Sequence, residues 1–481
     1  MLSFNVRTSC GPDDIPIEVF KVLGDYGLDL LVYLFNEILT SGRIPDAWRK
    51  SVITPIFKGK GDHQDVGNYR GIKLLSHTMK ILEKILEKRL RDLIEVDINQ
   101  FGFRPGVGTT DPQFCLRMAM EAFREKNKPF HAVFVDLEKA YDTVPRKLIW
   151  NCLRTREVPE CYIRLIQDMY RDSTTAVRCR QGESRAFPVS VGLHQGSALS
   201  PFLFIVIMDE ISKDCRRGGP WDMLYADDLV IFGSSHQDVE RRLEAWRRAF
   251  ESKGLRVSRS KTEYLSSDPR RTTMEIQSQP VKSVDCFKYL GSMVNTEVTS
   301  AGDVAHRVRC GWNTWKRLTP VLCDRRMPMK IKSKVYSSMI RPAILYGSEC
   351  WAPLKTDEQK LHVAEMRMLR WMQGYTRLDR KTNEEIRSNV EIAPIQEVAR
   401  ARRLSWFGHV QRRGESHPLK KASRLQVEGR RGRGRPKKTW TATITADMKA
   451  KGVDASLVHN RKEWKKRTGP TLGYAGQGST R

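Results

Sequence analysis

Apolar residues recur at a helical period in some parts of the chain and form short continuous runs in others. Between Thr78 and Val96 they lie three or four positions apart, with Lys and Arg on the opposite face, a pattern that predicts an amphipathic helix. Residues 11–50 are also expected to be helical. The run at 51–57 predicts a short strand, which leads into the polar loop KGKGDHQDVGNYR.

From residue 131 the pattern changes to alternating strands and helices. HAVFVDL and FPVSVGL predict strands, and ALSPFLFIVIMDEI predicts a buried helix. MLYADDLVIF, residues 223–232, predicts two strands joined by a turn, and further short strands are expected in GLRVSRSKTEYL and CFKYLGSMV. After residue 301 helices dominate, and one has an apolar face that ends just before Gly374.

Two carboxylates are adjacent in the turn of MLYADDLVIF. Asp227 and Asp228 lie between apolar runs, where their mutual repulsion and burial require a positive counter-charge. Alone they would favour a solvated turn, but Asp136 also ends an apolar strand, and neighbouring strands would bring it to the same edge. Carboxylates without His or Cys favour Mg²⁺ or Mn²⁺, and two such ions about 3.5 to 4 Å apart drive in-line phosphoryl displacement.

The charge of the chain points to a polyanionic partner. Lys and Arg number 84 against 56 Asp and Glu, a net charge of +28, and residues 401–481 hold 21 basic and 5 acidic residues. Nucleic acid is the first candidate partner and an acidic membrane surface the second. No apolar run approaches the roughly 20 residues of a membrane span, so a soluble intracellular protein without a membrane partner is expected. The ten cysteines form no CxxC pair, which argues against zinc and against a disulfide framework.

Three motifs carry a resemblance to a known family. FVDLEKAYD, GLHQGSALSP and YADD, in this order and spacing, resemble the palm of reverse transcriptases, and more narrowly that of non-LTR (LINE-type) retrotransposons. GPDDIPIEVFK, NYRGIKLLS, NQFGFRPGVGTTD, GLRVSRSKTE and FKYLG extend the resemblance over roughly residues 10 to 295. ILYGSECW, LSWFGHVQRR and GRGRPKKTW resemble, less specifically, the later part of RTE-like elements.

The resemblance implies an α+β fold, the right-hand polymerase. Its expected parts are fingers at 1–130, a palm with an antiparallel sheet at 131–295, a helical thumb at 296–378, and a basic, mainly helical C-terminal nucleic-acid-binding region at 379–481.

The resemblance assigns catalytic roles to the three aspartates. Asp136, Asp227 and Asp228 would be the catalytic residues and the metal ligands, with two Mg²⁺ ions as cofactor and Mn²⁺ as a possible substitute. Tyr141, five residues after Asp136, matches the steric gate, a ring that excludes a 2′-hydroxyl and so selects deoxynucleotides. The alternative is an aromatic ring that only packs.

The nucleotide site is expected to draw on two further segments. Gln195 and Gly196 would open the buried helix, where a bare backbone lets the nucleotide or template approach closely. Arg70, together with Lys58 or Lys60, would grip the triphosphate, Arg through its bidentate fork. The equally weighted alternative is that Lys58 and Lys60 are solvated loop lysines without this role.

The remaining assignments concern pyrophosphate release, template and primer. Lys261 matches a lysine that assists protonation of the leaving pyrophosphate, with a simple surface lysine as the alternative. Arg104 of FGFRP would contact the template backbone. Phe287, Tyr289 and Gly291 of FKYLG would form the primer grip.

The basic tail is open to several interpretations. Trp406 and Phe407 could stack on unpaired bases or belong to the core. The run RGRGRPKK favours nuclear import and non-specific phosphate binding ahead of an AT-hook-like insertion into the minor groove. Its candidate residues are Arg431, Arg433, Arg435, Lys437 and Lys438.

The implied function is RNA-directed DNA polymerisation. Such an enzyme extends a DNA primer 3′-hydroxyl with dNTPs on an RNA template, by target-primed reverse transcription, in the nucleus after a cytoplasmic ribonucleoprotein stage. Because the chain starts almost at the fingers, no endonuclease domain of its own is expected. The alternative function is a catalytically silent or domesticated nucleic-acid-binding relic of a retroelement.

Overall fold

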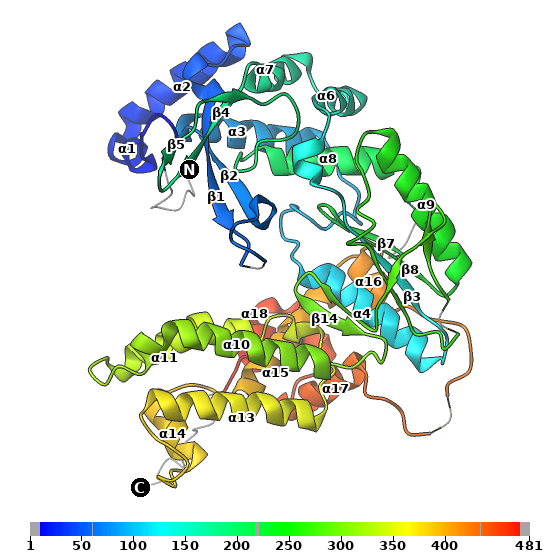
Figure 1. Ribbon diagram of the computed structural model, residues 1–481. Coiled ribbons are helices and arrows are strands. Elements are labelled where there is room, and N and C mark those ends of the chain that lie inside the picture. The colour runs from blue at the N-terminus through cyan, green and yellow to red at the C-terminus, as the bar shows by residue number, and fades with distance from the viewer. Residues whose placement is uncertain (1–9, 60, 217–220, 271, 433, 472–481) are drawn as a thin grey trace.

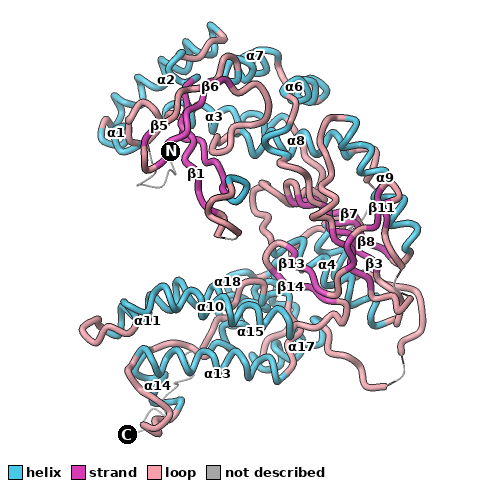
Figure 2. Tube along the Cα trace, viewed as in Figure 1, coloured by secondary structure: helices cyan, strands magenta, loops and turns pink. Residues whose placement is uncertain are grey.

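The computed structural model describes residues 10–59, 61–216, 221–270, 272–432 and 434–471. The N-terminal helices and the helices after residue 300 lie at opposite ends, and the sheet that carries the YADD turn lies to one side between them (Figure 1). Strands gather in the first 300 residues, and the rest of the described chain is helical (Figure 2). The fold is therefore α+β, as expected.

The N-terminal sheet is built from two distant segments. β1 (Lys50–Phe57) pairs antiparallel with β2 (Tyr69–Leu74) and parallel with β4 (Thr174–Cys179). The short strands β5 (Gly182–Glu183) and β6 (Phe187–Pro188) pair with β4. The α-helices of the first 170 residues are α1 (Ile17–Val22), α2 (Gly24–Ser41), α3 (His77–Leu93), α4 (Thr110–Glu125), α5 (Ala140–Thr143), α6 (Arg146–Thr155) and α7 (Glu160–Tyr170).

The strand expected in FPVSVGL is wrong beyond its first two residues. The chain leaves the sheet after β6, and Gly192 takes a φ of +81°. The backbone N–H groups of Gly192 and Leu193 donate to the carbonyls of Val144 and Tyr141, at 3.0 and 2.8 Å. These bonds attach the segment to the short helix α5 instead of to a strand.

The second sheet has the strand order β12-β9-β3-β8-β7. Its strands are β3 (His131–Val135), β7 (Asp222–Tyr225), β8 (Asp228–Gly233), β9 (Glu263–Ser266) and β12 (Lys282–Ser283). β8 lies antiparallel to both β3 and β7, and β9 lies antiparallel to β3. Two small hairpins flank it, β10 (Glu275–Ile276) with β11 (Gln279–Pro280) and β13 (Cys286–Tyr289) with β14 (Ser292–Asn295).

Both faces of the second sheet are covered, which explains why its strands are apolar without alternation. Val133 and Ile231 face the cluster built on α8 (Ser200–Ser212) and α9 (His236–Ser252). Phe134 and Val230 face the cluster that contains α4. The buried helix predicted from ALSPFLFIVIMDEI is confirmed as α8.

The helices after residue 300 form two groups. The first has its own core over residues 304–399, and the second packs against α4 through residues of the range 404–464. The apolar face predicted before Gly374 is buried in α13. The helices are α10 (Ala301–Leu322), α11 (Met329–Val335), α12 (Arg341–Ile344), α13 (Lys355–Met372), α14 (Asn383–Val390), α15 (Ile395–Gln411), α16 (Pro418–Ser423), α17 (Trp440–Lys451) and α18 (Arg461–Thr468).

The chain crosses the expected division at residue 130 in both directions. β4 and β6, from the range expected to be palm, complete the sheet of the fingers range. Conversely, α4, from the fingers range, packs under the second sheet. None of the described helices is long and apolar enough to cross a lipid bilayer.

Candidate active site

The acidic edge follows from the register of two neighbouring strands. The ladder between β3 and β8 ends at the pair Val135↔Leu229, so Asp136 and Asp228 follow it at the same edge. Asp227 lies in the tight turn between β7 and β8, next to Ala226, whose φ is +58°. The predicted adjacency of these two strands is confirmed.

The segment NQFGF, residues 99–103, holds this turn through hydrogen bonds. Gln100 Oε1 accepts hydrogen bonds from the backbone N–H of Ala226 at 3.1 Å and of Gly102 at 2.9 Å. Phe101 N–H donates to the carbonyl of Leu224 at 2.7 Å. A Cβ at Gly102 would lie 2.3 Å from Ala226 N, so only glycine allows this approach. Sequence reasoning placed this segment on the template path and missed its support of the catalytic turn.

Arg104 follows directly and is turned toward its own loop. Its Nη1 donates to the carbonyls of Asp97 and Ile98 at 3.2 and 3.1 Å, and burial lowers its pKa. A contact with the template backbone stays a prediction.

A cavity of about 460 Å³ opens beside the acidic edge. It brings together side chains that are more than two hundred residues apart in the sequence. Those predicted for the site are Lys58, Arg70, Asp136, Asp228, Lys261, Phe287 and Tyr289.

The pKa values of Asp227 and Asp228 are raised by burial and by neighbouring carboxylates, and two cations oppose the rise at Asp227. Partial burial raises the pKa of Asp228 to about 7, with contributions from Asp227 and Asp136. Burial likewise raises the pKa of Asp227, while Arg70 and Lys261 act in the opposite direction. Lys261 Nζ lies 2.9 Å from Asp136 Oδ2. The counter-charge that the sequence required is therefore supplied in part by Arg70 and Lys261.

The type of oxygen donor in this site suits a divalent ion, but the described carboxylates are not grouped around one ion position. Asp136, Asp227 and Asp228 offer only carboxylate oxygens, the donors that Mg²⁺ prefers. Within the described part of the chain, however, no three His, Cys, Asp or Glu side chains are grouped as a metal site. Lys261 contacts one of the carboxylates instead.

Tyr141 packs on a neighbouring ring and lies near the acidic edge. Its ring stacks on Phe204 with the centroids 4.6 Å apart, and the charge of Asp227 adds to the burial that raises its pKa. Its buried hydroxyl has no hydrogen-bond partner among the described residues. The ring is thus packed and close to the acidic edge, and the role of a steric gate stays a prediction.

Gln195 and Gly196 do not open the buried helix, which corrects the prediction. α8 begins at Ser200, and the two residues lie in the preceding loop. Lys73 N–H donates to the carbonyl of Gln195 at 2.7 Å. Gly196 has a φ of +114°, and a Cβ there would lie 2.3 Å from the Lys73 carbonyl oxygen. Glycine is required for this contact with β2 rather than for a helix start.

Glu83 anchors this loop from α3 and was missed by sequence reasoning. It is 2% exposed, and its carboxylate accepts hydrogen bonds from Ser197 Oγ at 2.7 Å and from Ala198 N–H at 2.8 Å. Burial raises the pKa of Glu83 above its usual value, although the charges of Lys80 and Lys73 act in the opposite direction. A signal was present, since position 83 falls on the apolar face of the helix predicted between Thr78 and Val96.

The hairpin of FKYLG is fixed to the second sheet. Phe287 stacks on Phe134 of β3 with the centroids 3.9 Å apart, and Tyr289 is buried. Leu290 and Gly291 both have positive φ, 45° and 89°, as in the two-residue turn that matches strand twist. Gln113 Nε2 donates to the Leu290 carbonyl at 2.8 Å. The primer contact itself stays a prediction.

The predicted triphosphate cations Arg70 and Lys58 also line the cavity. Arg70 is exposed on β2, and Lys58 is exposed at the end of β1, with its Nζ donating to the Gly67 carbonyl at 2.8 Å. Lys60 lies outside the described residues.

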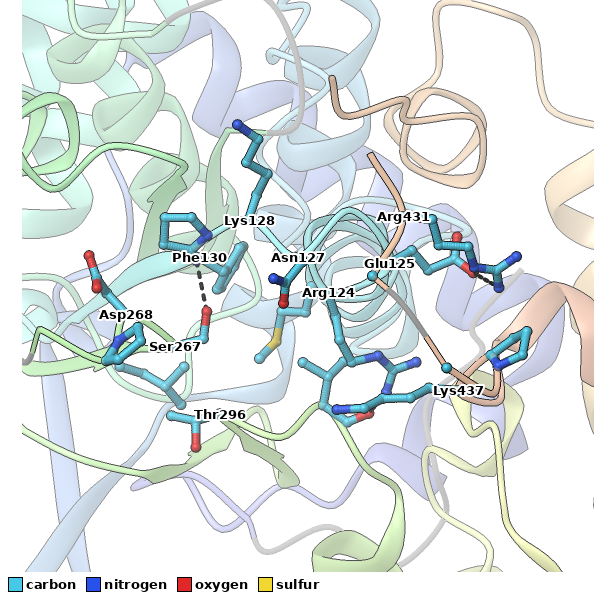
Figure 3. A pocket seen from close by; sticks show the side chains of 18 of the residues that line it. Arg124, Glu125, Asn127, Lys128, Phe130, Ser267, Asp268, Thr296, Arg431 and Lys437 are labelled. Atoms are coloured by element: carbon cyan, nitrogen blue, oxygen red, sulfur yellow. Dashed lines mark hydrogen bonds and ion pairs between the residues drawn. The ribbon is translucent and has the colours of Figure 1, made fainter. Parts of the chain in front are cut away.

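The tail segment RGRGRPKK is attached to α4, although Arg431, Arg435 and Lys437 are exposed. Arg431 Nη2 lies 3.6 Å from Glu125 Oε1, and Arg124 Nη2 donates to the Lys438 carbonyl at 2.9 Å. A cavity of about 540 Å³ separates the segment from the loop around Asp268 (Figure 3). Arg435 and Lys437 also line this cavity, and Arg433 lies outside the described residues.

Trp406 and Phe407 pack inside the C-terminal helical group. Trp406 lies edge-on to Phe114 of α4 at 5.9 Å, and Phe407 lies 6.2 Å from Trp440 and 6.0 Å from Trp464. These contacts favour the core alternative over stacking on bases.

Comparisons with known proteins match these features. Residues 58–294 match the model of the family "Reverse transcriptase (RNA-dependent DNA polymerase)". The chain is 23% identical over 390 residues to the RNA-directed DNA polymerase from mobile element jockey of Drosophila melanogaster, covering 77% of the chain and 42% of that protein. It is 26% identical over 335 residues to the Pol polyprotein of the type-1 retrotransposable element R2 of Popillia japonica, covering 64% and 45%.

The chain thus spans less than half the length of these two curated relatives. Among solved structures, apo telomerase from Candida tropicalis gives a TM-score of 0.42 at 10% identity, covering 94% of this chain and 74% of that chain. Residues 58–294 therefore belong to the reverse transcriptase family, in a chain related to the RNA-directed DNA polymerases of non-LTR retrotransposons.

Proposed function

We propose that the chain extends a DNA primer on an RNA template by target-primed reverse transcription. The observation that carries the proposal is the 460 Å³ cavity, which gathers acidic residues from two neighbouring strands and basic residues from two other segments. A polymerase needs this combination, because the acids serve the reacting 3′-hydroxyl and the cations serve the triphosphate.

Each residue of the site has a chemical task in this proposal. Asp136, Asp227 and Asp228 would hold two divalent ions, which would activate the 3′-hydroxyl and neutralise charge on the transferred phosphoryl group. Arg70 binds the triphosphate oxygens in bidentate fashion, with Lys58 as a second cation.

Two further residues act on selection and on the leaving group. Tyr141 excludes a ribose 2′-hydroxyl by its position near Asp227. Lys261, which lines the cavity, would donate a proton to the departing pyrophosphate.

The test is incorporation of dTTP on poly(rA)/oligo(dT) with Mg²⁺ or Mn²⁺. The intact chain is compared with the double variant Asp227→Ala, Asp228→Ala, and with Asp29→Ala, which removes an exposed carboxylate of α2 outside the cavity. Incorporation by the intact chain and Asp29→Ala, and loss of at least a thousandfold in the double variant, supports the proposal.

The opposite outcome identifies the second candidate function. If the intact chain incorporates no more than the double variant but still binds RNA, the chain is a catalytically silent nucleic-acid-binding protein. The net charge of +28 favours such binding whether or not catalysis occurs.

The basic tail extends the proposal to localisation. The basic segment 428–438 is suited to nuclear import, which target-primed synthesis on chromosomal DNA requires. A fluorescent fusion of the full chain is expected to accumulate in nuclei, and replacement of Arg435, Lys437 and Lys438 by Gln is expected to abolish the accumulation. Nuclear accumulation of that variant would contradict the proposal.

A further inference from the structure

The helical group over residues 304–399 has a hollowed surface between α10 and α13. Three adjoining hollows of about 800, 660 and 650 Å³ meet at Arg367, which lines all of them. Trp312 lines two of them and Trp371 lines two. None of the described residues of this surface also lines the cavity at the acidic edge, so the two sites are separate.

The centre of this surface is a guanidinium group that lies over two neighbouring indole rings. Arg367 Cζ lies 4.6 Å from the ring centroid of Trp371 and 5.6 Å from that of Trp312. The two indoles are 5.4 Å apart at an angle of 60°. Trp371 is 41% exposed and the neighbouring Val363 is 54% exposed, so apolar surface adjoins the guanidinium group.

The charge lining these hollows is of one sign. None of the described residues that line them is Asp or Glu. Lys360 has a distant ion pair with Asp357 at 3.9 Å, and Arg370 donates to Asn383 Oδ1 at 2.7 Å. The basic residues of the lining are Lys316, Lys355, Lys360, Arg367, Arg370 and Arg377.

This combination distinguishes between ligand classes. An apolar peptide would use the indoles but would leave six cations facing apolar or like-charged surface. A nucleic-acid duplex would satisfy the cations, but its bases are stacked inside the helix and present no faces to the indoles. A single strand satisfies both, since its phosphates pair with the cations and its bases stack on the rings.

We propose that Trp312, Arg367 and Trp371 form a binding site for unpaired nucleotides of single-stranded nucleic acid, outside the polymerase cavity. The site has no part in the polymerisation chemistry and does not depend on it. Its expected effect is to hold a strand that leaves or approaches the cavity.

The first test is the affinity of the full chain for a 5′-fluorescein oligo(rU) 12-mer, measured by fluorescence anisotropy. Stacking on an aromatic ring contributes about 1 to 3 kcal/mol per base. Trp371→Ala is therefore expected to weaken binding about 10-fold, and Trp371→Phe to retain most of the affinity. The charge control is Arg248→Gln on α9, whose side chain is 73% exposed, and it is expected to change affinity less than twofold.

A second test uses the unaltered chain and is independent of any effect of substitution on folding. A 5-iodouridine oligonucleotide is photo-crosslinked after saturation of the polymerase cavity with a blunt-ended RNA–DNA duplex, which has no unpaired bases to occupy the proposed site or to pair with the probe. Crosslinks are expected in the tryptic peptides 310–316 and 371–377, which contain Trp312 and Trp371.

Three results would overturn the inference. The first is the absence of crosslinks to both peptides. The second is a Trp371→Ala chain that binds the 12-mer as the parent does, or loses no more affinity than Arg248→Gln. The third is self-association of the chain that Trp371→Ala abolishes while affinity for the 12-mer is unchanged, because the surface is then an interface between copies. Failure of dNTP incorporation affects none of these readouts.

Discussion

Glu83 of α3 accepts hydrogen bonds from Ser197 Oγ and Ala198 N–H, and so joins α3 to the loop that holds Gln195 and Gly196. Glu83→Ala leaves two buried donors unpaired, at a cost of about 1 to 3 kcal/mol for each. The loop is then expected to shift, and kcat/KM for dNTP to fall at least 10-fold. Steady-state incorporation kinetics measure the loss, and thermal melting reports how much of it is global.

The matched control for this variant is on the same helix. Glu87→Ala, one turn further along α3, removes a carboxylate that pairs with Arg91 near the surface. It is expected to keep kcat/KM within twofold of the parent. Equal activity of Glu83→Ala and Glu87→Ala would show that Glu83 does not position the loop.

Alanine substitutions at Gly196 and Gly106 distinguish the effect of a steric clash from the effect of backbone strain. Both have positive φ, +114° and +71°, but a Cβ at Gly196 would lie 2.3 Å from the Lys73 carbonyl oxygen, whereas a Cβ at Gly106 would meet nothing within 4 Å. Gly106→Ala is therefore expected to cost only about 1 to 2 kcal/mol of stability and to preserve incorporation. Gly196→Ala is expected to reduce incorporation about 100-fold or more. Similar activities for the two variants would contradict a special role for Gly196.

The acidic edge was predictable from sequence because it depends on local signals. Apolar runs that end in Asp136 and flank Asp227 define strands and a tight turn. Pairing of the two strands then brings these aspartates to the same edge of the sheet. The supports of the site depend on partners far away in the chain. Glu83 lies 114 residues from Ser197, and Gln100 lies 126 residues from Ala226. A periodicity marks such residues as buried, but it does not identify what they contact.

The fold shows the same difference between local and distant information. Helices α3 and α13 follow from periodicity and α8 from a continuous apolar run, whereas the end of the strand in FPVSVGL after β6 follows from neither. There the backbone of Gly192 and Leu193 bonds to Val144 and Tyr141, contacts that arise only in the folded chain. The placement of α17 against α4 through Trp440 also lay beyond the sequence.

Lys261 and a divalent cation are expected to compete for Asp136. The ammonium group lies 2.9 Å from Asp136 Oδ2, so Lys261→Met removes a positive charge from the ligand cluster. The variant is expected to bind Mn²⁺ several-fold more tightly, measured by electron paramagnetic resonance without substrate, although it loses the proposed proton donor. Lys253→Met, at the C-terminal end of α9, is the control and is expected to leave Mn²⁺ affinity unchanged. Weaker Mn²⁺ binding by Lys261→Met would mean that the lysine orders the carboxylate.

Tyr141 can be tested for the gate and for packing at once. Tyr141→Phe keeps the ring that stacks on Phe204 and removes a buried hydroxyl without a partner among the described residues, so sugar selectivity is expected to be unchanged. Tyr141→Ala is expected to lower the ratio of kcat/KM for dTTP over UTP at least 10-fold. If Tyr141→Ala lowers the melting temperature but keeps this ratio, the ring only packs.

Glu121 of α4 is expected to make stability depend on pH. Its Oε2 accepts a hydrogen bond from Trp440 N–H at 2.9 Å, and burial raises its pKa from 4.5 to about 7 against the opposing effects of that bond, Arg124 and Arg117. In the unfolded chain the carboxyl group ionises near pH 4.5, whereas in the folded chain it keeps its proton up to about pH 7. The free energy of unfolding therefore falls as pH rises from about 4.5 to about 7, and this contribution is constant above that range.

Glu121→Gln isolates this effect, because the amide is neutral at every pH and its oxygen can still accept from Trp440. The stability of the variant relative to the parent is expected to increase between pH 4.5 and pH 8 by at most about 3 kcal/mol. Urea unfolding at both pH values measures the increase, and any fixed cost of the amide N–H groups cancels between them. Glu125→Gln, on the same helix and partly exposed, is expected to show no such increase. An equal or decreasing advantage of Glu121→Gln at pH 8 would mean that Glu121 is already ionised in the folded chain at pH 4.5.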